Sequence, residues 1–461
     1  MVTDPYLLPP EAVRTLEGWR ALGGGEGLAA CLALGPEATI EAVTRSGLRG
    51  RGGGGFPTGR KWAGVRDQPG SRRYVVANGA EGEPATFKDR AIMRANPYQV
   101  VEGLVIAALA VGAERAYLCV KERFERELAA VTAAIEEMAE AGLTAEVPVT
   151  VVAGPDEYLF GEEKAMLEVI EGRPPMPRLF PPYEHGLFAV APQMGWESVA
   201  PRDPSGSGDQ SNPTAVNNVE TLAHVPHLLA RGADWFRSLG TEASPGHGVV
   251  TVVGDVRTPA CAEFDLGTPL RALVEEVGGG VAPGREVKAA FSGVANPVLT
   301  PAMLDTPVAF ETMAAAGTGM GAAGYVVYDD TACMVQVAAL LSRFLWVESC
   351  GQCPPCKLGC EEVTRRLAAL EACRASDRDV AAIGARLEQV TDANRCFLGA
   401  EEQALVASVL RAYPDDFAAH LEGDCGAHRP DLVVPKLVDL EGGRAVYDER
   451  QARKQPDWTY A

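Results

Sequence analysis

Four cysteines lie close together in the stretch ESCGQCPPCKLGC, residues 348–360, of a chain that contains 11 cysteines in 461 residues. Cys350, Cys353 and Cys356 follow one another at x2 spacing, which places three thiolates on one short loop, as an iron–sulfur cubane requires. Zinc is the alternative, but zinc sites usually consist of separated C-x2-C pairs. Disulfides are disfavoured because we expect a reducing, cytoplasmic compartment. The spacing therefore predicts an iron–sulfur cluster.

The spacing leaves the fourth cluster ligand open. Cys360 continues the run as C-x2-C-x2-C-x3-C, but in two-cluster ferredoxins the fourth cysteine of such a run binds the other cluster, and no second run exists here. Cys396, in NRCFLGA, is the distant candidate and is weakly favoured. The remaining cysteines are expected to be small buried hydrophobic residues without a ligand role: Cys31, Cys119, Cys261, Cys333, Cys373 and Cys425.

A second candidate for chemistry is the glycine-rich stretch GLRGRGGGGFPTGRKW, residues 47–62. Consecutive glycines expose backbone N–H groups without a Cβ in the way, which suits a phosphate or a flat ring. The stretch matches neither G-x-G-x-x-G nor the P-loop, so P-loop hydrolysis is disfavoured. Arg60 and Lys61 add positive charge. Phe56 and Trp62 argue against a plain flexible linker, because linkers seldom contain large aromatic residues.

Three polar side chains lie at the end of the strand predicted at residues 73–79 or just after it, in ANGAEGEPATFKDR. Ligands of α/β sheets bind at the carboxyl ends of strands. Asn78, Glu81 and Glu83 could therefore hydrogen-bond the hydroxyls of a ribose or ribityl chain. The alternative interpretation is a solvated turn.

Two further motifs combine polar residues with a helix start. Glu162 and Glu163, in YLFGEEKAMLEVIEG, could serve a site or could only stabilise the helix dipole. Asn217 and Asn218, in TAVNNVETL, precede an apolar helix, where asparagine is ordinarily an N-cap.

The elements that must position these motifs alternate between strand and helix. After a helical segment over residues 1–47, the hydrophobic pattern predicts strands at 73–79, 115–121 and 147–154, separated by helices at 98–111 and 123–142. Such alternation is typical of an α/β layer.

We predict four parts along the chain. Residues 1–245 form the α/β domain, with an exposed loop insertion at 189–210 that is rich in Gly, Pro and Ser. Residues 246–327 form a small α+β module. Residues 328–420 form a bundle of four helices around the cysteine loop, and the polar residues 421–461 form a docking tail.

Composition excludes several classes of function. With 62 acidic and 42 basic residues the formal net charge is −20, which repels nucleic acid phosphates. The N-terminus MVTDPYLLPP lacks the features of a signal peptide, and no apolar run reaches the roughly 18–20 residues needed to span a bilayer. We expect a cytoplasmic chain that does not span a membrane and binds no nucleic acid, although it could lie on the cytoplasmic face of a membrane complex.

Taken together and in this order, the five motifs resemble the NADH-binding flavoprotein subunit of respiratory complex I and its relatives in NAD-linked hydrogenases and formate dehydrogenases. The resemblance extends over about residues 17–420. The corresponding family forms are GLRGRGGAGFPTGLKW, NADESEPG-FKDR, YICGEETALL, VNNVET and ESCGQCTPC. The resemblance implies a Rossmann-like α/β flavin-binding domain, a ubiquitin-like β-grasp domain (SLBB-like), and a C-terminal helical bundle with a [4Fe–4S] cluster.

The resemblance also implies a role for particular residues. Cys396 corresponds to the fourth cluster ligand, and Cys360 stands where the family usually has threonine. Phe56, Glu83 and Glu163 are expected to face the nicotinamide nucleotide, the two glutamates as catalytic residues, and Glu163 should repel a 2′-phosphate and so favour NADH over NADPH. FMN is expected to be held by Gly50, Gly52, Gly53, Gly55, Lys61, Asn78, Glu81, Tyr158, Gly161, Asn217, Asn218 and Thr221.

The implied activity is NADH dehydrogenase. Hydride passes from NADH to FMN, and single electrons pass through the [4Fe–4S] cluster to a partner, first a thioredoxin-like [2Fe–2S] subunit of a larger oxidoreductase.

Several residues depart from the family pattern and motivate an alternative hypothesis. Ala80 replaces an Asp, Gly64 and Phe180 stand where an aromatic and a basic residue are usual, and further substitutions are Tyr183, Phe160 and Lys164. In the alternative, FMN and the cluster remain, the NADH site is altered or lost, and electrons are exchanged with a protein partner. A third hypothesis is a scaffold without cofactors.

Overall fold

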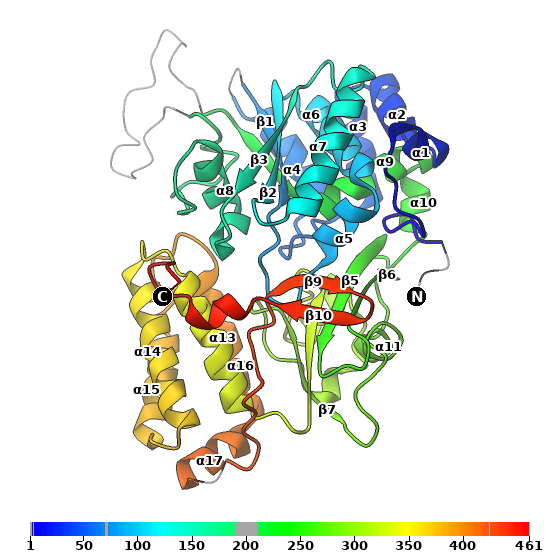
Figure 1. The fold of residues 1–461 in the computed structure, drawn as a ribbon. Helices are drawn as coiled ribbons and strands as arrows, with labels where there is room; N and C mark the ends of the chain where they lie inside the picture. Colours follow the sequence, from blue (N-terminus) through cyan, green and yellow to red (C-terminus); the bar gives the residue numbers. More distant parts are fainter. Residues whose placement is uncertain (1, 3, 70–71, 190–210, 424, 461) are drawn as a thin grey trace.

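The computed structural model describes residues 2, 4–69, 72–189, 211–423 and 425–460 (Figure 1). Apart from Ala189, the predicted insertion at 189–210 lies outside these residues. In Figure 1 an α/β layer lies above a second, mixed sheet and a bundle of helices. Within the described ranges no helix is both long and apolar enough to cross a membrane.

The first sheet consists of parallel strands in the order β3-β2-β1-β4. They are β1 (Tyr74–Gly79), β2 (Arg115–Lys121), β3 (Val149–Gly154) and β4 (Thr214–Asn218). Three of them match the predicted strands within two residues. The fourth, β4, was not predicted, because a five-residue strand that ends in two amides looks like a helix cap. It pairs with β1 and places Asn217 and Asn218 beside Ala77 and Asn78.

Helices surround this sheet. The crossover helices are α5 (Lys88–Ala95), α6 (Pro97–Val111) and α7 (Glu125–Glu140), followed by η1 (Tyr158–Gly161), α8 (Glu163–Ile170), α9 (Val219–Arg231) and α10 (Ala233–Arg237). The N-terminal helices are α1 (Leu16–Ala21), α2 (Glu26–Leu34), α3 (Pro36–Ser46) and α4 (Thr58–Asp67). Since neighbours cover α6 on nearly every side, almost all of its residues are buried.

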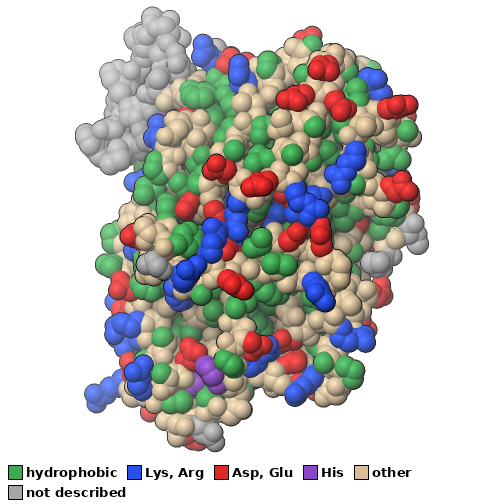
Figure 2. Space-filling model, in the orientation of Figure 1, with side chains coloured by type: hydrophobic (Ala, Val, Ile, Leu, Met, Phe, Trp, Pro, Cys, Tyr) green, Lys and Arg blue, Asp and Glu red, His purple; other side chains and the backbone are tan. Residues whose placement is uncertain are grey.

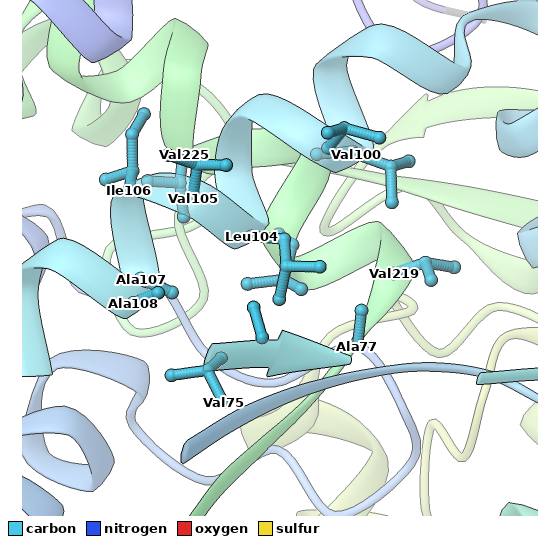
Figure 3. Packing of buried hydrophobic residues seen from close by; sticks show 14 of the residues in the cluster. Val75, Ala77, Val100, Leu104, Val105, Ile106, Ala107, Ala108, Val219 and Val225 are labelled. Atoms are coloured by element: carbon cyan, nitrogen blue, oxygen red, sulfur yellow. The ribbon is translucent and has the colours of Figure 1, made fainter. Parts of the chain in front are cut away.

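The core of the α/β layer forms where β1, α6 and α9 meet. Figure 3 shows the side chains of Val75, Leu104, Val219 and Val225 in the region where these elements meet, and all four belong to one buried cluster. Parallel strands that are covered on both faces are expected to have near-continuous apolar sequences, because side chains on both faces are buried. This rigid layer fixes the carboxyl ends of β1 and β4.

The second sheet has the order β6-β5-β8-β7, with β5 and β8 parallel and the outer pairs antiparallel. Its elements are β5 (His247–Gly254), β6 (Ala260–Asp265), α11 (Leu270–Glu276), β7 (Val287–Ser292), η2 (Pro301–Met303), α12 (Phe310–Ala315) and β8 (Gly324–Asp329). Leu270 and Leu273 of α11 share a buried cluster with Val250 and Val252 of β5.

The bundle consists of α13 (Met334–Glu348), α14 (Pro354–Glu371), α15 (Asp377–Leu387), α16 (Leu398–Ala412) and α17 (Pro414–Glu422). The prediction of four helices was one short. Pro414 explains the difference, because proline cannot continue α16 but suits the first turn of a new helix. The cysteine motif joins α13 to α14.

The C-terminal segment packs on this chain itself through β9 (Leu437–Glu441), β10 (Arg444–Tyr447) and η3 (Glu449–Arg453). Figure 2 shows Lys and Arg side chains in a band with Asp and Glu among them, where Figure 1 places these elements. One of the ion pairs joins Arg94 of α5 to Asp439 at 2.7 Å. Beyond η3, the fully buried Lys454 binds both carboxylate oxygens of Glu348, at 2.9 and 2.8 Å. The segment therefore connects the α/β layer to the bundle.

Candidate active site

A cavity of about 1070 Å³ lies where the glycine loop, the carboxyl ends of β1 and β4, the start of α8 and the loop before α16 meet. This is the position at which open α/β sheets bind ligands. Most of the predicted site residues line it: Gly50, Gly52, Gly55, Phe56, Lys61, Asn78, Gly161, Glu163, Asn217, Asn218 and Thr221. The structure thus gathers residues from four separate motifs around one space.

The glycine loop forms an open cradle on one side of this cavity. The N–H of Arg51 donates to Thr221 Oγ1 at 2.8 Å, which fastens the loop to α9. Gly53 and Gly55 have φ of 112° and 59°, a region that disfavours other residues. A Cβ on Gly54 would meet no atom within 4 Å, so the space in front of this residue is free for a ligand.

Amide side chains hold the opposite edge in place. Asn217 Oδ1 accepts a 2.9 Å hydrogen bond from Trp62 Nε1, and Asn78 Nδ2 donates to the carbonyl of Gly161 at 2.7 Å. Asn218 caps α9 through its side-chain oxygen. The three amides are therefore oriented by the protein before any ligand arrives.

Opposite charges lie at the mouth of the cavity. Lys61 Nζ is 3.3 Å from Glu163 Oε2 and donates to the carbonyl of Val216 at 3.0 Å. Both side chains keep part of their surface exposed, 29% for Lys61 and 40% for Glu163. The lysine can reach a phosphate, and the carboxylate can accept hydrogen bonds from ribose hydroxyls.

Two predicted residues, Gly53 and Glu81, do not line the cavity. Glu81 forms a buried ion pair with Arg90 at 2.8 Å and accepts from the N–H of Asp89. Its oxygens are thereby used to hold the turn after β1. Glu81 was expected to help hold FMN, whereas in the structure its carboxylate accepts hydrogen bonds from Asp89 and Arg90 of the protein itself.

Glu83 and Tyr158 also lie outside the cavity lining, at the junction of the three parts of the fold. Glu83 accepts from the hydroxyl of Tyr158 and from the N–H of Val294, both at 2.6 Å. Tyr158 also contacts Glu401 of α16 at 3.1 Å, and burial raises the pKa of Glu401 to about 8. Glu83 was expected to face the nicotinamide, but a backbone N–H of the second module binds its carboxylate. The sequence carries no signal of this long-range contact.

The four predicted cluster cysteines surround a second, smaller cavity. Cys350, Cys353, Cys356 and Cys396 all line it, together with Leu159, Ser349, Asn394, Arg395 and Leu398, whereas Cys360 does not. The N–H of Arg395 donates to Cys353 Sγ at 3.4 Å, and Ser349 Oγ lies 3.4 Å from Cys356 Sγ. Four thiols around one void, with donors to sulfur, fit a cubane cluster.

Cys360 occupies a different position. It lies one turn after Cys356 in α14 and is fully buried. A hydrogen bond with Cys356, together with burial, raises the pKa of the Cys360 thiol. The thiol is therefore held in its neutral form behind the cysteine cavity.

The two cavities share a wall, of which only Cys396 was predicted from the sequence. Asn394, Arg395 and Cys396 line both of them. Phe397, the next residue, lines the large cavity with 79% of its surface exposed. Only the proximity of these residues to Cys396 in the sequence could have pointed to them. A ligand in the large cavity lies next to whatever the cysteines bind.

Some departures from the family pattern also lie in the large cavity. Gly64 and Tyr183 line it, as does Lys164, whereas Phe180 and Ala80 do not. Two large apolar side chains, Phe56 and Tyr183, are 47% and 45% exposed there and offer flat surfaces to a ring.

Comparison with family models divides the chain into three regions. Residues 43–227 match the Nuo51 FMN-binding domain, residues 249–290 the SLBB domain, and residues 336–420 the NADH-ubiquinone oxidoreductase-F iron–sulfur binding region. The large cavity is formed mainly by the first region, and the cysteine cavity by the third.

Similar proteins cover most of the chain. The NADH-quinone oxidoreductase F-subunit 2 of Rhizobium meliloti (strain 1021) is 38% identical over 84% of this chain and 89% of its own length. The NADP-reducing hydrogenase subunit HndC of Solidesulfovibrio fructosivorans is 32% identical over 94% and 85%. A crystal structure of NAD⁺-reducing [NiFe]-hydrogenase in the H₂-reduced state is 31% identical, with a TM-score of 0.75, and the match covers 91% of this chain and 68% of that chain.

The cavities and these similarities lead to one conclusion. The chain belongs to the family of NADH-quinone oxidoreductase F-subunits, whose members are FMN and [4Fe–4S] electron-transfer proteins.

Proposed function

We propose that this chain oxidises NADH at the large cavity and delivers the electrons through the cysteine cavity to a partner subunit. The observation that carries the proposal is the wall of Asn394, Arg395 and Cys396 that the two cavities share. When bound, FMN supplies hydride chemistry, and the cluster supplies one-electron chemistry. Because only one loop separates the two spaces, no long route through the protein is needed.

The role of the protein is to bind FMN and the cluster and to hold them in a fixed orientation. The glycine cradle from Gly50 to Gly55 lets a flat ring approach the backbone closely, and Lys61 neutralises a phosphate. Asn78, Asn217 and Thr221 present fixed polar atoms to FMN. The four cysteines at 350, 353, 356 and 396 hold the cluster.

The nucleotide faces Phe56 and Glu163. Glu163 reads the ribose hydroxyls and disfavours a 2′-phosphate by charge repulsion. Glu83 would have to release Tyr158 and the N–H of Val294 to reach a nucleotide, so its carboxylate holds the protein and not the nucleotide.

We also propose the surroundings of this chain. Relatives are named as subunits of NADH-quinone oxidoreductase and of hydrogenases, which supports a larger assembly. As the first acceptor in it we propose a thioredoxin-like [2Fe–2S] subunit, and as its location the cytoplasm. For the SLBB region, the order β6-β5-β8-β7 with a parallel central pair and one helix, α11, between β6 and β7 supports a β-grasp class.

A second candidate function keeps both cofactors but exchanges electrons with a protein partner in place of NADH. Gly64 favours it, because this residue lines the cavity where the family commonly has an aromatic side chain, and so leaves one face of the nucleotide site without a ring. The two functions differ in whether NADH alone reduces the flavin.

Purified chain that contains FMN and iron should lose its flavin absorbance within seconds of adding millimolar NADH under anaerobic conditions. Because Glu163 carries a charge at the mouth, NADPH should act at least about tenfold more slowly, and Glu163→Gln should narrow that difference. Stopped-flow absorbance gives both rates. If NADH leaves the flavin oxidised while dithionite bleaches it, NADH oxidation is refuted and the second candidate gains.

A further inference from the structure

A group of metal-binding side chains lies at the far end of the helical bundle, away from the cysteine cavity. Cys333 directly precedes α13, whereas Cys350 follows its end. A helix of 15 residues is about 22 Å long, so the two cysteines are separated by about that length. His420, in the last turn of α17, and Cys425 lie beside Cys333.

The three side chains are close enough to share one ion. Their ligand atoms, two Sγ and one imidazole nitrogen, all lie within 4.8 Å of one another. The closest pair is Cys333 Sγ and His420 Nε2, at 3.0 Å. Cys333 and His420 are buried, and Cys425 is half-buried. The fold thus brings a buried histidine beside two thiols that are far apart in the sequence.

We propose that Cys333, His420 and Cys425 bind one Zn²⁺. Two sulfur ligands and one imidazole are the donor set that zinc prefers among the common divalent ions. Zn–S and Zn–N bonds of about 2.3 and 2.0 Å in a tetrahedron place sulfur and nitrogen roughly 3.5 Å apart. Cys333 Sγ and His420 Nε2, now 3.0 Å apart, therefore need to separate by about 0.5 Å.

A fourth side chain fixes the ring orientation. Cys373, just beyond α14, has its Sγ 3.5 Å from His420 Nδ1. Zinc-binding histidines usually engage their second nitrogen with such an outer partner, which sets the tautomer. On binding, the Cys333 and Cys425 thiols each release a proton to solvent, so the charge of the ion is balanced by two thiolates.

The ion would have a structural role, as a cross-link between segments of the chain. It joins the start of α13 to the end of α17, which is distant along the chain. It also holds the beginning of the C-terminal segment, which only a short loop connects to α17. This site is independent of flavin and of the cysteine cavity, so its failure would leave the proposed function untouched.

The test is the zinc content of the whole chain, purified with reductant from cells grown with zinc. Plasma mass spectrometry should find about one zinc per chain beside the iron of the cluster. The zinc K-edge absorption spectrum should show sulfur near 2.3 Å and nitrogen near 2.0 Å. The double variant Cys333→Ser/Cys425→Ser should lose at least about 90% of the zinc and keep iron and flavin.

Cys31→Ser is the matched control, because Cys31 is also buried but lies in α2, and it should keep its zinc. Four results would overturn the proposal: wild-type chain without zinc, a zinc spectrum with only oxygen and nitrogen neighbours, a Cys333–Cys425 disulfide in peptides mapped without reductant, or zinc retained by the double variant. If the double variant does not fold, the wild-type spectrum decides alone.

Discussion

Cys396→Ala should lower the iron content from about four atoms per chain to three or fewer, because the fourth iron of the cubane loses its protein ligand and the cluster becomes labile. FMN should remain bound, since the glycine cradle and the amides of β1 and β4 are untouched. The effect is expected to be this large because Cys396 is the one thiol that the loop before α16 contributes to the cysteine cavity, and the other described thiols of that lining, Cys350, Cys353 and Cys356, all come from the motif. Iron analysis and visible absorbance of anaerobically prepared protein measure the outcome.

Cys360→Ala is the matched control for this experiment. Cys360 is equally a cysteine of the motif, but it lies outside the cavity lining and is fully buried in α14. We expect its iron content to match that of the wild type. The opposite pattern, with iron lost in Cys360→Ala and kept in Cys396→Ala, would show that the local C-x3-C spacing identifies the ligand and that our assignment is wrong.

Gly54→Trp should weaken FMN binding at least about 100-fold, which corresponds to roughly 2.8 kcal/mol. Gly54 lines the large cavity, and a Cβ placed on it points into space without a neighbour within 4 Å. An indole ring on that Cβ would take the volume in which we place the flavin. Fluorescence titration of flavin-stripped chain with FMN gives the dissociation constant.

Gly54→Ala provides the control, since one methyl group fits the free space and FMN should bind within about threefold of the wild type. Iron content should be unchanged in both variants, because the cysteine cavity lies beyond Asn394–Cys396. Equal FMN affinity for Gly54→Trp and the wild type would place the flavin elsewhere and contradict the cradle.

Much of the α/β layer could be predicted because its signals are local. The apolar runs at β1, β2 and β3 and the apolar helix α6 reveal themselves by periodicity, and glycine loops and paired amides stand out by type. Strand β4 was not predicted, because its five residues end in Asn217 and Asn218, which indicate a helix cap as strongly as a strand. A short strand of this kind is stabilised by its neighbours in the sheet, which the sequence does not display.

The missed parts of the site depend on contacts between distant segments. Glu83 lies outside the cavity lining, and its carboxylate accepts a hydrogen bond from the N–H of Val294, 211 residues away in the sequence. Cys333 and Cys425 were expected to be small buried hydrophobic residues, and their separation in the sequence gives no sign that His420 lies beside both of them. Spacing alone likewise left both Cys360 and Cys396 as candidates for the fourth cluster ligand. The fold distinguishes them, because the loop before α16 brings Cys396 to the cysteine cavity, whereas Cys360 does not line it.

The most direct test of the central claim is electron paramagnetic resonance of the chain frozen after anaerobic mixing with NADH. The shared wall predicts that NADH produces the signal of a reduced [4Fe–4S] cluster, with an intensity close to that produced by dithionite. A flavin that bleaches with NADH while the cluster stays silent, although dithionite reduces it, would show that the two cavities do not exchange electrons and would contradict the account.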